Sequence, residues 1–328
     1  MTDATYSYQT LSPEEILDAV ESQGFLCDGR LLALNSYENR VYQVGVEDDQ
    51  PIIAKFYRPH RWGDATIQEE HDFAWELTDT EIPLIAPLKN ANGETLYKHH
   101  LFRFALFPRS GGRAPELDDP KHLEQIGTFL GRIHIVGQSK TFQHRPTLTI
   151  ESVGEESYRF LLDQGFIPDE LTTAYRSLAE DLIQRVRWCY ERAGNVRVIR
   201  LHGDCHPSNI LWTDDGPHIV DLDDARMGPA IQDLWMFISG DRSYQTWCLN
   251  KLLEGYTQFC DFDPCELHLI EALRTLRMLY YHAWLARRWD DPAFPRAFPW
   301  FNSQRCWEQH ILDLREQAAL MDEPPLQL

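Results

Sequence analysis

Cationic residues are scarce in this chain. Lysine and arginine number 31 against 51 aspartates and glutamates, which gives a formal net charge of −20. Polyanions are bound by cationic side chains that neutralise their phosphates, so this balance works against nucleic acid as a partner. It also works against anionic membrane surfaces. We therefore expect neither a nucleic-acid partner nor a membrane partner.

Long apolar runs are also lacking, since no uninterrupted stretch approaches the roughly 18 residues that suggest a membrane-spanning helix. The first twenty residues are acidic and do not contain the basic segment and apolar run of a signal peptide. The seven cysteines are odd in number and show no paired short spacing, which argues against a disulfide framework or a CxxC metal site. We expect a cytoplasmic monomer with reduced thiols.

The composition is otherwise that of a folded protein, with 43% apolar and 25% charged residues over 328 positions. This length suits one or two domains. Near the start, Ser12, Pro13 and Glu15 predict a capped helix, in which Ser12 accepts from the backbone and Glu15 reaches back toward it.

The first third of the chain reads as rich in strands. β-Branched and aromatic runs predict an antiparallel hairpin over residues 40–57, and residues 96–108 supply a further strand. Between them, residues 64–77 predict a helix with Asp64 as its cap. Glycine and proline then interrupt the pattern, which predicts a boundary near residue 110 and an N-terminal lobe over residues 1–110.

The remainder, residues 111–328, reads as mostly helical. Apolar residues recur at helical spacing over residues 121–134 and 266–289. Two short strands, "VRVIRL" and "HIVDLDD", flank a polar loop between them. A small β-rich lobe followed by a larger helical lobe is an order of elements that resembles a protein kinase-like fold, α+β and bilobal. The resemblance implies a nucleotide-binding N-terminal lobe over residues 1–110 and a C-terminal lobe over residues 111–328 that carries the catalytic loop and the acceptor site.

The polar loop reads "HGDCHPSN", residues 202–209. Asp204 and Asn209 have the separation of a kinase catalytic loop, in which the aspartate accepts the proton of the attacking hydroxyl and the asparagine binds magnesium. Asp221 follows at the end of a short apolar strand, as a carboxylate suited to Mg²⁺. The spacing predicts Asp204 and Asp221 as catalytic residues, with Asn209 and Asp221 as metal ligands.

Two other readings of this loop stay open. His202, Asp204 and His206 could bind zinc or iron if the loop were extended, although Pro207 argues against that conformation. Cys205 could act as a nucleophile, but a reactive cysteine needs a positioned base and an electropositive setting. Packing is the simpler role for this cysteine.

Upstream residues complete the kinase pattern. Lys55 lies late in a predicted strand, where a phosphate-pairing lysine is expected. On the following helix, Glu70 falls on the apolar face and Glu69 points away, so we expect Glu70 to pair with Lys55. The glycines of a G-x-G-x-x-G phosphate loop are missing from residues 34–45, where Ser36 is our candidate for contacting the nucleotide.

Together these residues resemble the choline kinase and aminoglycoside phosphotransferase superfamily, whose loop reads H-G-D-x-H-x-x-N. Residues 130–134 and 228–235 also resemble its helical lobe. The resemblance implies ATP and Mg²⁺, Asp204 as the base, Asn209 and Asp221 as magnesium ligands, and Asp233 as a structural aspartate that braces the catalytic loop.

Longer strings, among them "LNSYENRVYQ", "VDLDDAR" and "EPPLQL", resemble a bacterial stress-response family of serine/threonine kinases within that superfamily. This implies a protein substrate with a serine or threonine acceptor, the chain itself included. Two alternatives remain: a kinase for a small alcohol such as choline, homoserine or a sugar, and a nucleotide-binding pseudokinase. The aromatic residues 277–301 could cage a quaternary ammonium group, although such a stripe is more often helix core.

Overall fold

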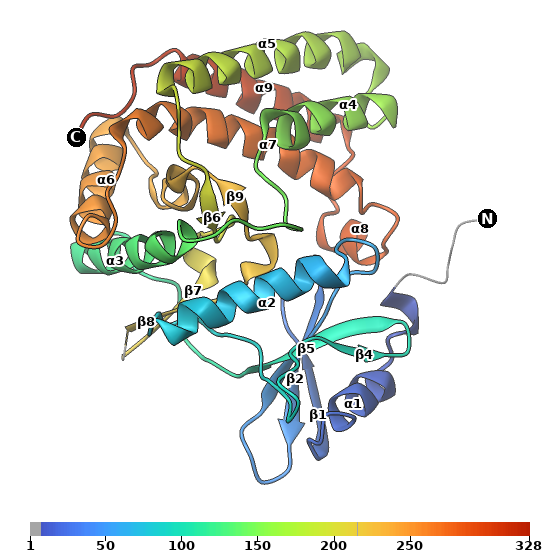
Figure 1. Ribbon diagram of the computed structural model, residues 1–328. Helices are drawn as coiled ribbons and strands as arrows, with labels where there is room; N and C mark the ends of the chain where they lie inside the picture. Colours follow the sequence, from blue (N-terminus) through green and yellow to red (C-terminus); the bar gives the residue numbers. More distant parts are fainter. Residues whose placement is uncertain (1–7, 215) are drawn as a thin grey trace. The chain divides into compact units, whose positions relative to one another are not determined.

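The computed structural model describes residues 8–214 and 216–328 (Figure 1). Residues 1–7 of the acidic opening stretch lie outside the described residues. The chain divides into two compact units. The sheet unit contains the described residues up to Glu116, together with Phe142–Arg145 and His206–Ala225. The helical unit contains Leu117–Thr141, Pro146–Cys205 and Arg226–Leu328.

The main sheet of the sheet unit has five antiparallel strands in the order β1-β2-β3-β5-β4. Their bounds are β1 Cys27–Ala33, β2 Arg40–Val46, β3 Ile52–Phe56, β4 Tyr97–His99 and β5 Phe102–Pro108. The hairpin predicted over residues 40–57 is confirmed as β2–β3. Strand β1 was not predicted, and the single strand predicted over residues 96–108 is a hairpin of β4 and β5.

Two helices lie on opposite faces of this sheet, because successive side chains of a strand point to opposite sides. Ile52, Ala54 and Phe56 of β3 share a core with α1, Pro13–Glu21, which follows the short 3-10 helix Tyr8–Thr10. The intervening residues face α2, Asp64–Asp79, where Tyr57 and Ala105 pack with Ile67. Lys55 therefore points toward α2.

The starts of these helices differ in how they are capped. The side chain of Ser12 accepts from the Glu15 backbone, as predicted, but the Glu15 carboxylate contacts His99 and His100 instead of reaching back. The prediction that Asp64 caps α2 is wrong: Gly63 is the cap, without a side-chain bond. The Asp64 carboxylate instead pairs with basic side chains of the β4–β5 hairpin.

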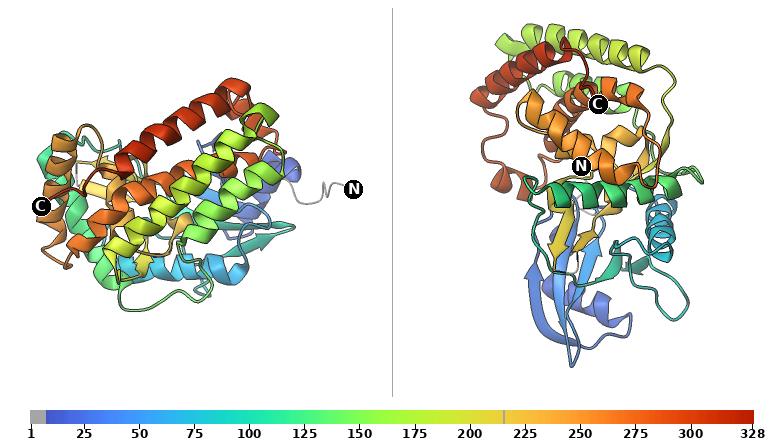
Figure 2. Two further views of the ribbon diagram at one scale, coloured as in Figure 1. Left: turned by 90° about the horizontal axis from the view of Figure 1, so that it is seen from above. Right: turned by 90° about the vertical axis from the view of Figure 1, so that its left-hand side faces the viewer.

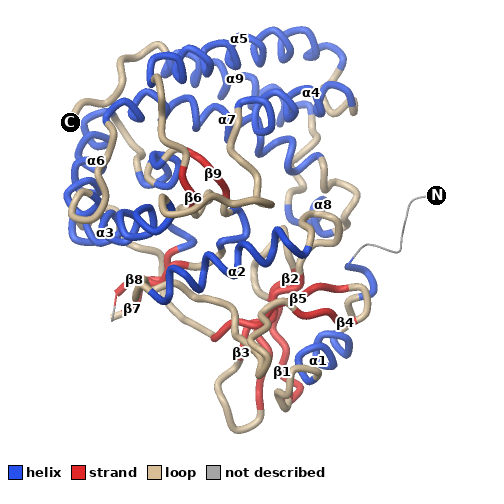
Figure 3. Tube along the Cα trace, viewed as in Figure 1, coloured by secondary structure: helices blue, strands red, loops and turns tan. Residues whose placement is uncertain are grey.

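Most of the helical unit is built from α-helices of 5 to 25 residues (Figures 2 and 3). They are α3 Pro120–Gly137, α4 Glu156–Asp163, α5 Asp169–Ala193, α6 Arg242–Tyr256, α7 Ile270–Ala286, α8 Ala293–Ala297 and α9 Gln304–Met321. Helices α4, α5, α7 and α9 lie side by side around one apolar core. The predicted helices over residues 121–134 and 266–289 correspond to α3 and α7, the second preceded by a 3-10 segment at Pro264–Leu269.

Two short strand pairs complete the fold. Strand β6, Ile199–Leu201, pairs with β9, Arg226–Gly228, in the helical unit. Strand β7, Ile210–Thr213, pairs with β8, Gly216–Ile219, in the sheet unit. The predicted strand "VRVIRL" is thus confined to its last three residues, and "HIVDLDD" is strand only at its beginning. Short helical turns cover Ile150–Glu155, Pro207–Asn209, Leu222–Asp224, Ala230–Asp233 and Trp235–Phe237.

The division into an N-terminal lobe over residues 1–110 and a C-terminal lobe over residues 111–328 stays a prediction. Contacts between residues group the segment His206–Ala225 with the sheet, although it lies far along the chain. Within the described residues, no helix is both long and apolar enough to cross a membrane.

Candidate active site

Lys55 and Glu70 form a buried ion pair in the sheet unit. The Lys55 Nζ lies 3.4 Å from Glu70 Oε1, and the two side chains are 8% and 4% exposed. On α2, Glu70 is buried along with Ile67, Ala74 and Leu77, as the helical spacing predicts. A carboxylate on an apolar helix face is costly unless it is paired, and Lys55 supplies that partner.

The neighbouring Glu69 makes a different set of contacts. Its carboxylate accepts backbone N–H bonds from Gln143, His144 and Arg145, at 2.6 to 2.9 Å. These bonds fasten α2 to the short segment Phe142–Arg145, which belongs to the same unit. Of the two adjacent glutamates, Glu70 is therefore the partner of Lys55.

Asp221 also contacts Lys55, with 3.1 Å between Oδ1 and Nζ. Its side chain is 51% exposed, in contrast to that of Glu70. Its backbone has φ 65°, the left-handed region that residues other than glycine seldom adopt. Strained backbone of this kind persists where the surrounding structure fixes it, often at functional sites.

The hairpin β7–β8 brings Asn209 close to the chain before Asp221. Ile210 pairs with Ile219, so the residues just outside the hairpin meet, and the Val220 N–H donates to the Asn209 carbonyl at 3.1 Å. The hairpin thus brings Asn209 and Asp221, which are twelve positions apart in the sequence, close together in space. The two side chains offer an amide oxygen and a carboxylate, donors that fit Mg²⁺ because hard cations prefer oxygen ligands.

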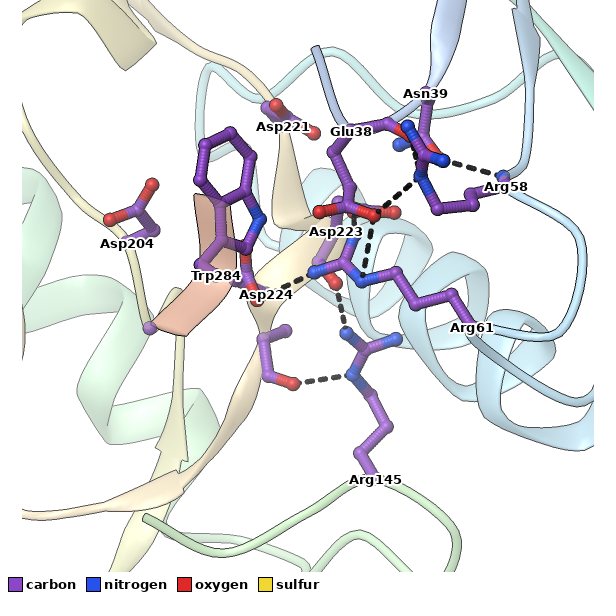
Figure 4. A network of polar contacts seen from close by, with 12 residues as sticks. Glu38, Asn39, Arg58, Arg61, Arg145, Asp204, Asp221, Asp223, Asp224 and Trp284 are labelled. Atoms are coloured by element: carbon purple, nitrogen blue, oxygen red, sulfur yellow. Dashed lines mark hydrogen bonds and ion pairs between the residues drawn. The ribbon is translucent and has the colours of Figure 1, made fainter. Parts of the chain in front are cut away.

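Asp223 is a central acidic residue that the sequence analysis missed (Figure 4). It is buried and pairs with Arg61, while its Oδ1 lies 3.2 Å from Lys55 Nζ. Arg61 also binds Asp224 at 2.8 Å. The signal was present in "VDLDDAR", because Asp223 stands two residues after Asp221, but a short string with three aspartates does not show which one is buried.

Arg145 ties this acidic segment to α2 and was also missed. Its guanidinium donates to the backbone carbonyls of Thr66, Asp223 and Ala225, and lies 3.5 Å from Glu70 Oε2. A buried guanidinium with several acceptors fixes the backbone on both sides. Arg145 therefore supports the positions of Glu70 and Asp223.

The charges of this cluster are strongly coupled. Burial lowers the pKa of Lys55, but the carboxylates of Asp221, Asp223 and Glu70 outweigh it and raise that pKa well above its ordinary value. Burial likewise disfavours ionised Asp223, yet Arg61 and Lys55 bring its pKa below the ordinary value. The pKa of Glu70 is raised, because burial outweighs the attraction of Lys55. Lys55 is thus a charged ammonium among acidic groups.

The loop that contains Ser36 lies inside the β1–β2 hairpin. Strand β1, which was not predicted, precedes this loop and pairs with β2 after it. The Leu34 N–H donates to the Val41 carbonyl at 2.8 Å and closes the loop. Ser36 is partly exposed, while Asn39 is buried and accepts from the Arg58 backbone at 3.1 Å.

Asp204 belongs to the helical unit and follows β6. The loop before it is braced by the buried Asp233, whose carboxylate accepts the N–H groups of His202 and Gly203, both at 2.8 Å. His134 lies against the same carboxylate at 3.1 Å. The bracing role that the resemblance implies for Asp233 is therefore confirmed.

Arg277 of α7 contacts Asp204 directly and had no sequence signal of its own. One guanidinium nitrogen lies 2.5 Å from Asp204 Oδ1, and the two side chains are 43% and 25% exposed. Arginine is common on long helices, so only the packing of α7 identifies this one.

The two other readings of the loop lose support. Cys205 is fully buried, and burial raises its pKa well above the ordinary value, so the nucleophilic thiolate is disfavoured. Across residues 8–214 and 216–328, neither His202 nor His206 belongs to a group of three metal-binding side chains with donor atoms within 4.8 Å of one another. Pro207 begins a 3-10 turn, so the loop is not extended.

Comparison with known proteins gives consistent matches. Residues 30–267 match the phosphotransferase enzyme family. The chain is 46% identical over 328 residues to stress response kinase A of Escherichia coli O157:H7, covering 100% of this chain and 99% of that protein. It is 45% identical, with the same coverage, to the serine/threonine protein kinase RdoA of Salmonella typhimurium (strain LT2).

Solved structures of similar fold are more distant in sequence. An amicoumacin kinase in complex with AMP-PNP, Ca²⁺ and its ligand has a TM-score of 0.69 at 17% identity, covering 94% of this chain and 93% of that one. A microcompartment-associated aminopropanol kinase has a TM-score of 0.69 at 18% identity, covering 92% and 96%. These matches confirm the predicted α+β, kinase-like fold with a β-sheet N-terminal region and a helical remainder.

Proposed function

Because the chain belongs to the phosphotransferase enzyme family and, within it, to the stress response kinase A family, we propose that it is an ATP-dependent serine/threonine protein kinase of the bacterial stress response. The acceptor is the hydroxyl of a serine or threonine in a protein, which includes the chain itself. The kinase acts in the cytoplasm as a monomer.

The observation that carries the proposal is the set of contacts around Lys55. Its buried ammonium lies within 3.4 Å of the carboxylates of Glu70, Asp221 and Asp223. An ammonium fixed by a helix glutamate is the arrangement with which kinases position nucleotide phosphates. Asp223 and Glu70 also contact arginines, whereas the Asp221 side chain is half exposed and accessible to a ligand.

Each candidate residue takes one role. Lys55 pairs with the phosphates of ATP, Glu70 orients Lys55, and Ser36 contacts the nucleotide from the β1–β2 loop. Asn209 and Asp221 hold Mg²⁺, which when bound neutralises charge on the phosphates. Asp204 accepts the proton of the acceptor hydroxyl as its oxygen bonds to the γ-phosphorus, and ADP leaves with the electrons of the broken P–O bond.

A kinase for small alcohols is the second candidate, and its support from the aromatic residues is reduced. Trp284 packs against Phe294 with 5.2 Å between ring centroids, and Trp307 against Phe301 with 5.5 Å. Phe294, Phe301 and Trp307 are buried in the core of the helical unit, so they cannot form an open cage for an ammonium group. The third candidate is a pseudokinase, which would not need a catalytic base. This alternative predicts nucleotide binding without phosphate transfer.

Transfer of labelled phosphate from ATP to a generic protein substrate and to a panel of small alcohols tests the proposal. We expect label on serine or threonine, and Asp204→Asn should reduce turnover by about 10²–10⁴-fold while ATP binding is retained. Asp261→Asn, an exposed aspartate of the same unit, is the matched control and should transfer normally. Label confined to small alcohols would refute the protein-kinase assignment, and no transfer despite ATP binding would favour a pseudokinase.

A further inference from the structure

Two histidines and a glutamate of the sheet unit lie close together, and none of them is among the candidate kinase residues. They are Glu15 in the first turn of α1, and His99 and His100 at the turn of the β4–β5 hairpin. Each offers one ligand atom, and the three atoms lie within 4.8 Å of one another. The described residues contain no other such group of three.

The distances are close to those of a metal site. Glu15 Oε2 lies 3.4 Å from His99 Nε2 and 2.7 Å from His100 Nδ1. In tetrahedral zinc sites the Zn–N and Zn–O bonds are about 2.0–2.2 Å, which separates two donor atoms by roughly 3.4 Å. The separation from His99 already fits, and the separation from His100 would have to lengthen by about 0.7 Å through a small movement of the carboxylate.

The tight turn between β4 and β5 brings His99 and His100 together, and two-residue hairpin turns commonly need a positive φ. His100 has φ 48°, a left-handed conformation in which a residue other than glycine is uncommon. The Nε2 atom of His99 is buried and, although it lies 3.4 Å from Glu15 Oε2, it makes no hydrogen bond among the described residues. The Glu15 side chain, freed from capping, is directed to the same point.

We propose that Glu15, His99 and His100 form a binding site for a divalent transition metal, with Zn²⁺ as the best fit and water as the fourth ligand. Two imidazoles and one carboxylate, with one open position, are a common zinc ligand set. Bound metal would join α1 to β4. Helix α1 precedes β1, and β1 and β4 are the two edge strands of the sheet. Bound metal would therefore fix α1 against the sheet face on which it packs.

Titration calorimetry with ZnCl₂ on tag-free protein tests the site. The parent for all variants is Asp221→Asn, so that zinc at the proposed magnesium site does not contribute. We expect one Zn²⁺ per chain, a raised unfolding temperature with metal, and d–d absorption of a tetrahedral site with Co²⁺. Glu15→Gln and His100→Asn preserve shape, and asparagine tolerates a positive φ; each should weaken binding at least about tenfold, because one of three ligands is lost.

His122→Gln is the matched control, because this histidine lies 4.0 Å from a carboxylate of Asp119 but outside the cluster. It should bind zinc like the parent. Circular dichroism without metal checks that each variant folds. If only one of Glu15→Gln and His100→Asn folds, that variant alone tests the site. Equal zinc affinity in a folded cluster variant, or no stoichiometric binding by the parent, would overturn the site. Phosphate transfer by protein with wild-type Asp221 is measured separately, so failure of this proposal and of the kinase proposal are distinguishable.

Discussion

Glu69 and Glu70 are adjacent and chemically identical, yet they have opposite surroundings. Glu70 lies in the ion-pair cluster with Lys55, and burial raises its pKa although the charge of Lys55 opposes that shift. Glu69 accepts three backbone N–H bonds, which lower its pKa although burial opposes them. Glu70 is therefore the ion-pair partner of Lys55, whereas Glu69 binds the backbone of the segment Phe142–Arg145.

Glu70→Gln and Glu69→Gln should separate these two roles. For Glu70→Gln we expect kcat/KM for ATP to fall by roughly 10–100-fold with little change in stability, because Lys55 loses an orienting charge. For Glu69→Gln we expect normal ATP kinetics and a loss of about 1.5–3 kcal/mol in the free energy of unfolding, since hydrogen bonds to a charged acceptor are weakened. Kinetics and urea unfolding of both proteins measure this, and the reverse pattern would show that Glu69 is the partner of Lys55.

Glu266 links stability to pH at a single position. It is buried, and burial raises its pKa from 4.5 to about 7, although it accepts the Ile231 N–H at 2.8 Å. The folded protein therefore binds a proton that the unfolded chain releases, and stability is lost as pH rises from 4.5 to about 7. The loss is about 3 kcal/mol in total.

Glu266→Gln should remove this loss, because glutamine keeps an acceptor for Ile231 and cannot ionise. We expect the variant to gain about 2–3 kcal/mol over the wild type at pH 8 relative to pH 4. Glu254→Gln, at an exposed position of α6, is the control and should show no such gain. Urea unfolding at both pH values decides, and parallel stability curves for wild type and variant would contradict the prediction.

At the scale of elements, α3 and α6 pack at unusually close backbone distance. A Cβ atom on Gly127 would lie 1.9 Å from the Leu252 carbonyl oxygen, and one on Gly255 would lie 1.8 Å from that of Glu124. Both helices must therefore carry glycine where they cross. The contact matters for the site, since the same helix α3 carries His134, which contacts Asp233 beneath the catalytic loop.

Gly127→Ala tests this crossing. In an isolated helix alanine is favoured over glycine by about 1 kcal/mol. Here we expect the opposite, a loss of about 1–3 kcal/mol, because the added methyl group meets backbone that cannot move aside. Gly111→Ala, with open space around its Cβ position, should change stability by less than about 0.5 kcal/mol. A Gly127→Ala protein as stable as wild type would mean that the helices can separate.

For the whole molecule, the sheet unit is assembled from three separate stretches of the chain. Ile219 bonds to Pro83 and Ile85 through its backbone, and Arg113 bonds to Trp212. Lys55 finds Asp221 and Asp223 in that same late stretch. The first 116 residues thus lack part of their own unit.

A fragment of residues 1–116 should therefore fold poorly. We expect it to unfold at lower urea concentration than the full chain and to bind ATP at least about tenfold more weakly, because Lys55 has lost two of its carboxylate partners and the backbone groups of residues 83–85 are unpaired. Tryptophan fluorescence during urea unfolding and nucleotide titration measure both effects. A fragment matching the full chain in both would show that residues 206–225 are dispensable for the sheet unit.

The sequence by itself determined the family, the fold class and the pairing of Lys55 with Glu70. These follow from short-range patterns: the spacing within "HGDCHPSN", the period of strands and helices, and the apolar face of one helix. Local patterns also misled where competing bonds exist. Asp64 pairs with β4 and β5 instead of capping α2, and Glu15 contacts two histidines instead of the start of its own helix.

Only the tertiary structure decided which charged residues meet from distant parts of the chain. The cluster around Lys55 contains Asp223, Arg61 and Arg145, and Arg277 contacts Asp204. No spacing in the sequence predicts these contacts. The physical reason is that a buried charge is stable only beside a partner, and the partner comes from whichever segment packs there. Such pairing depends on the packing of segments far apart in sequence, whereas helix faces and loop motifs depend on residues a few positions apart.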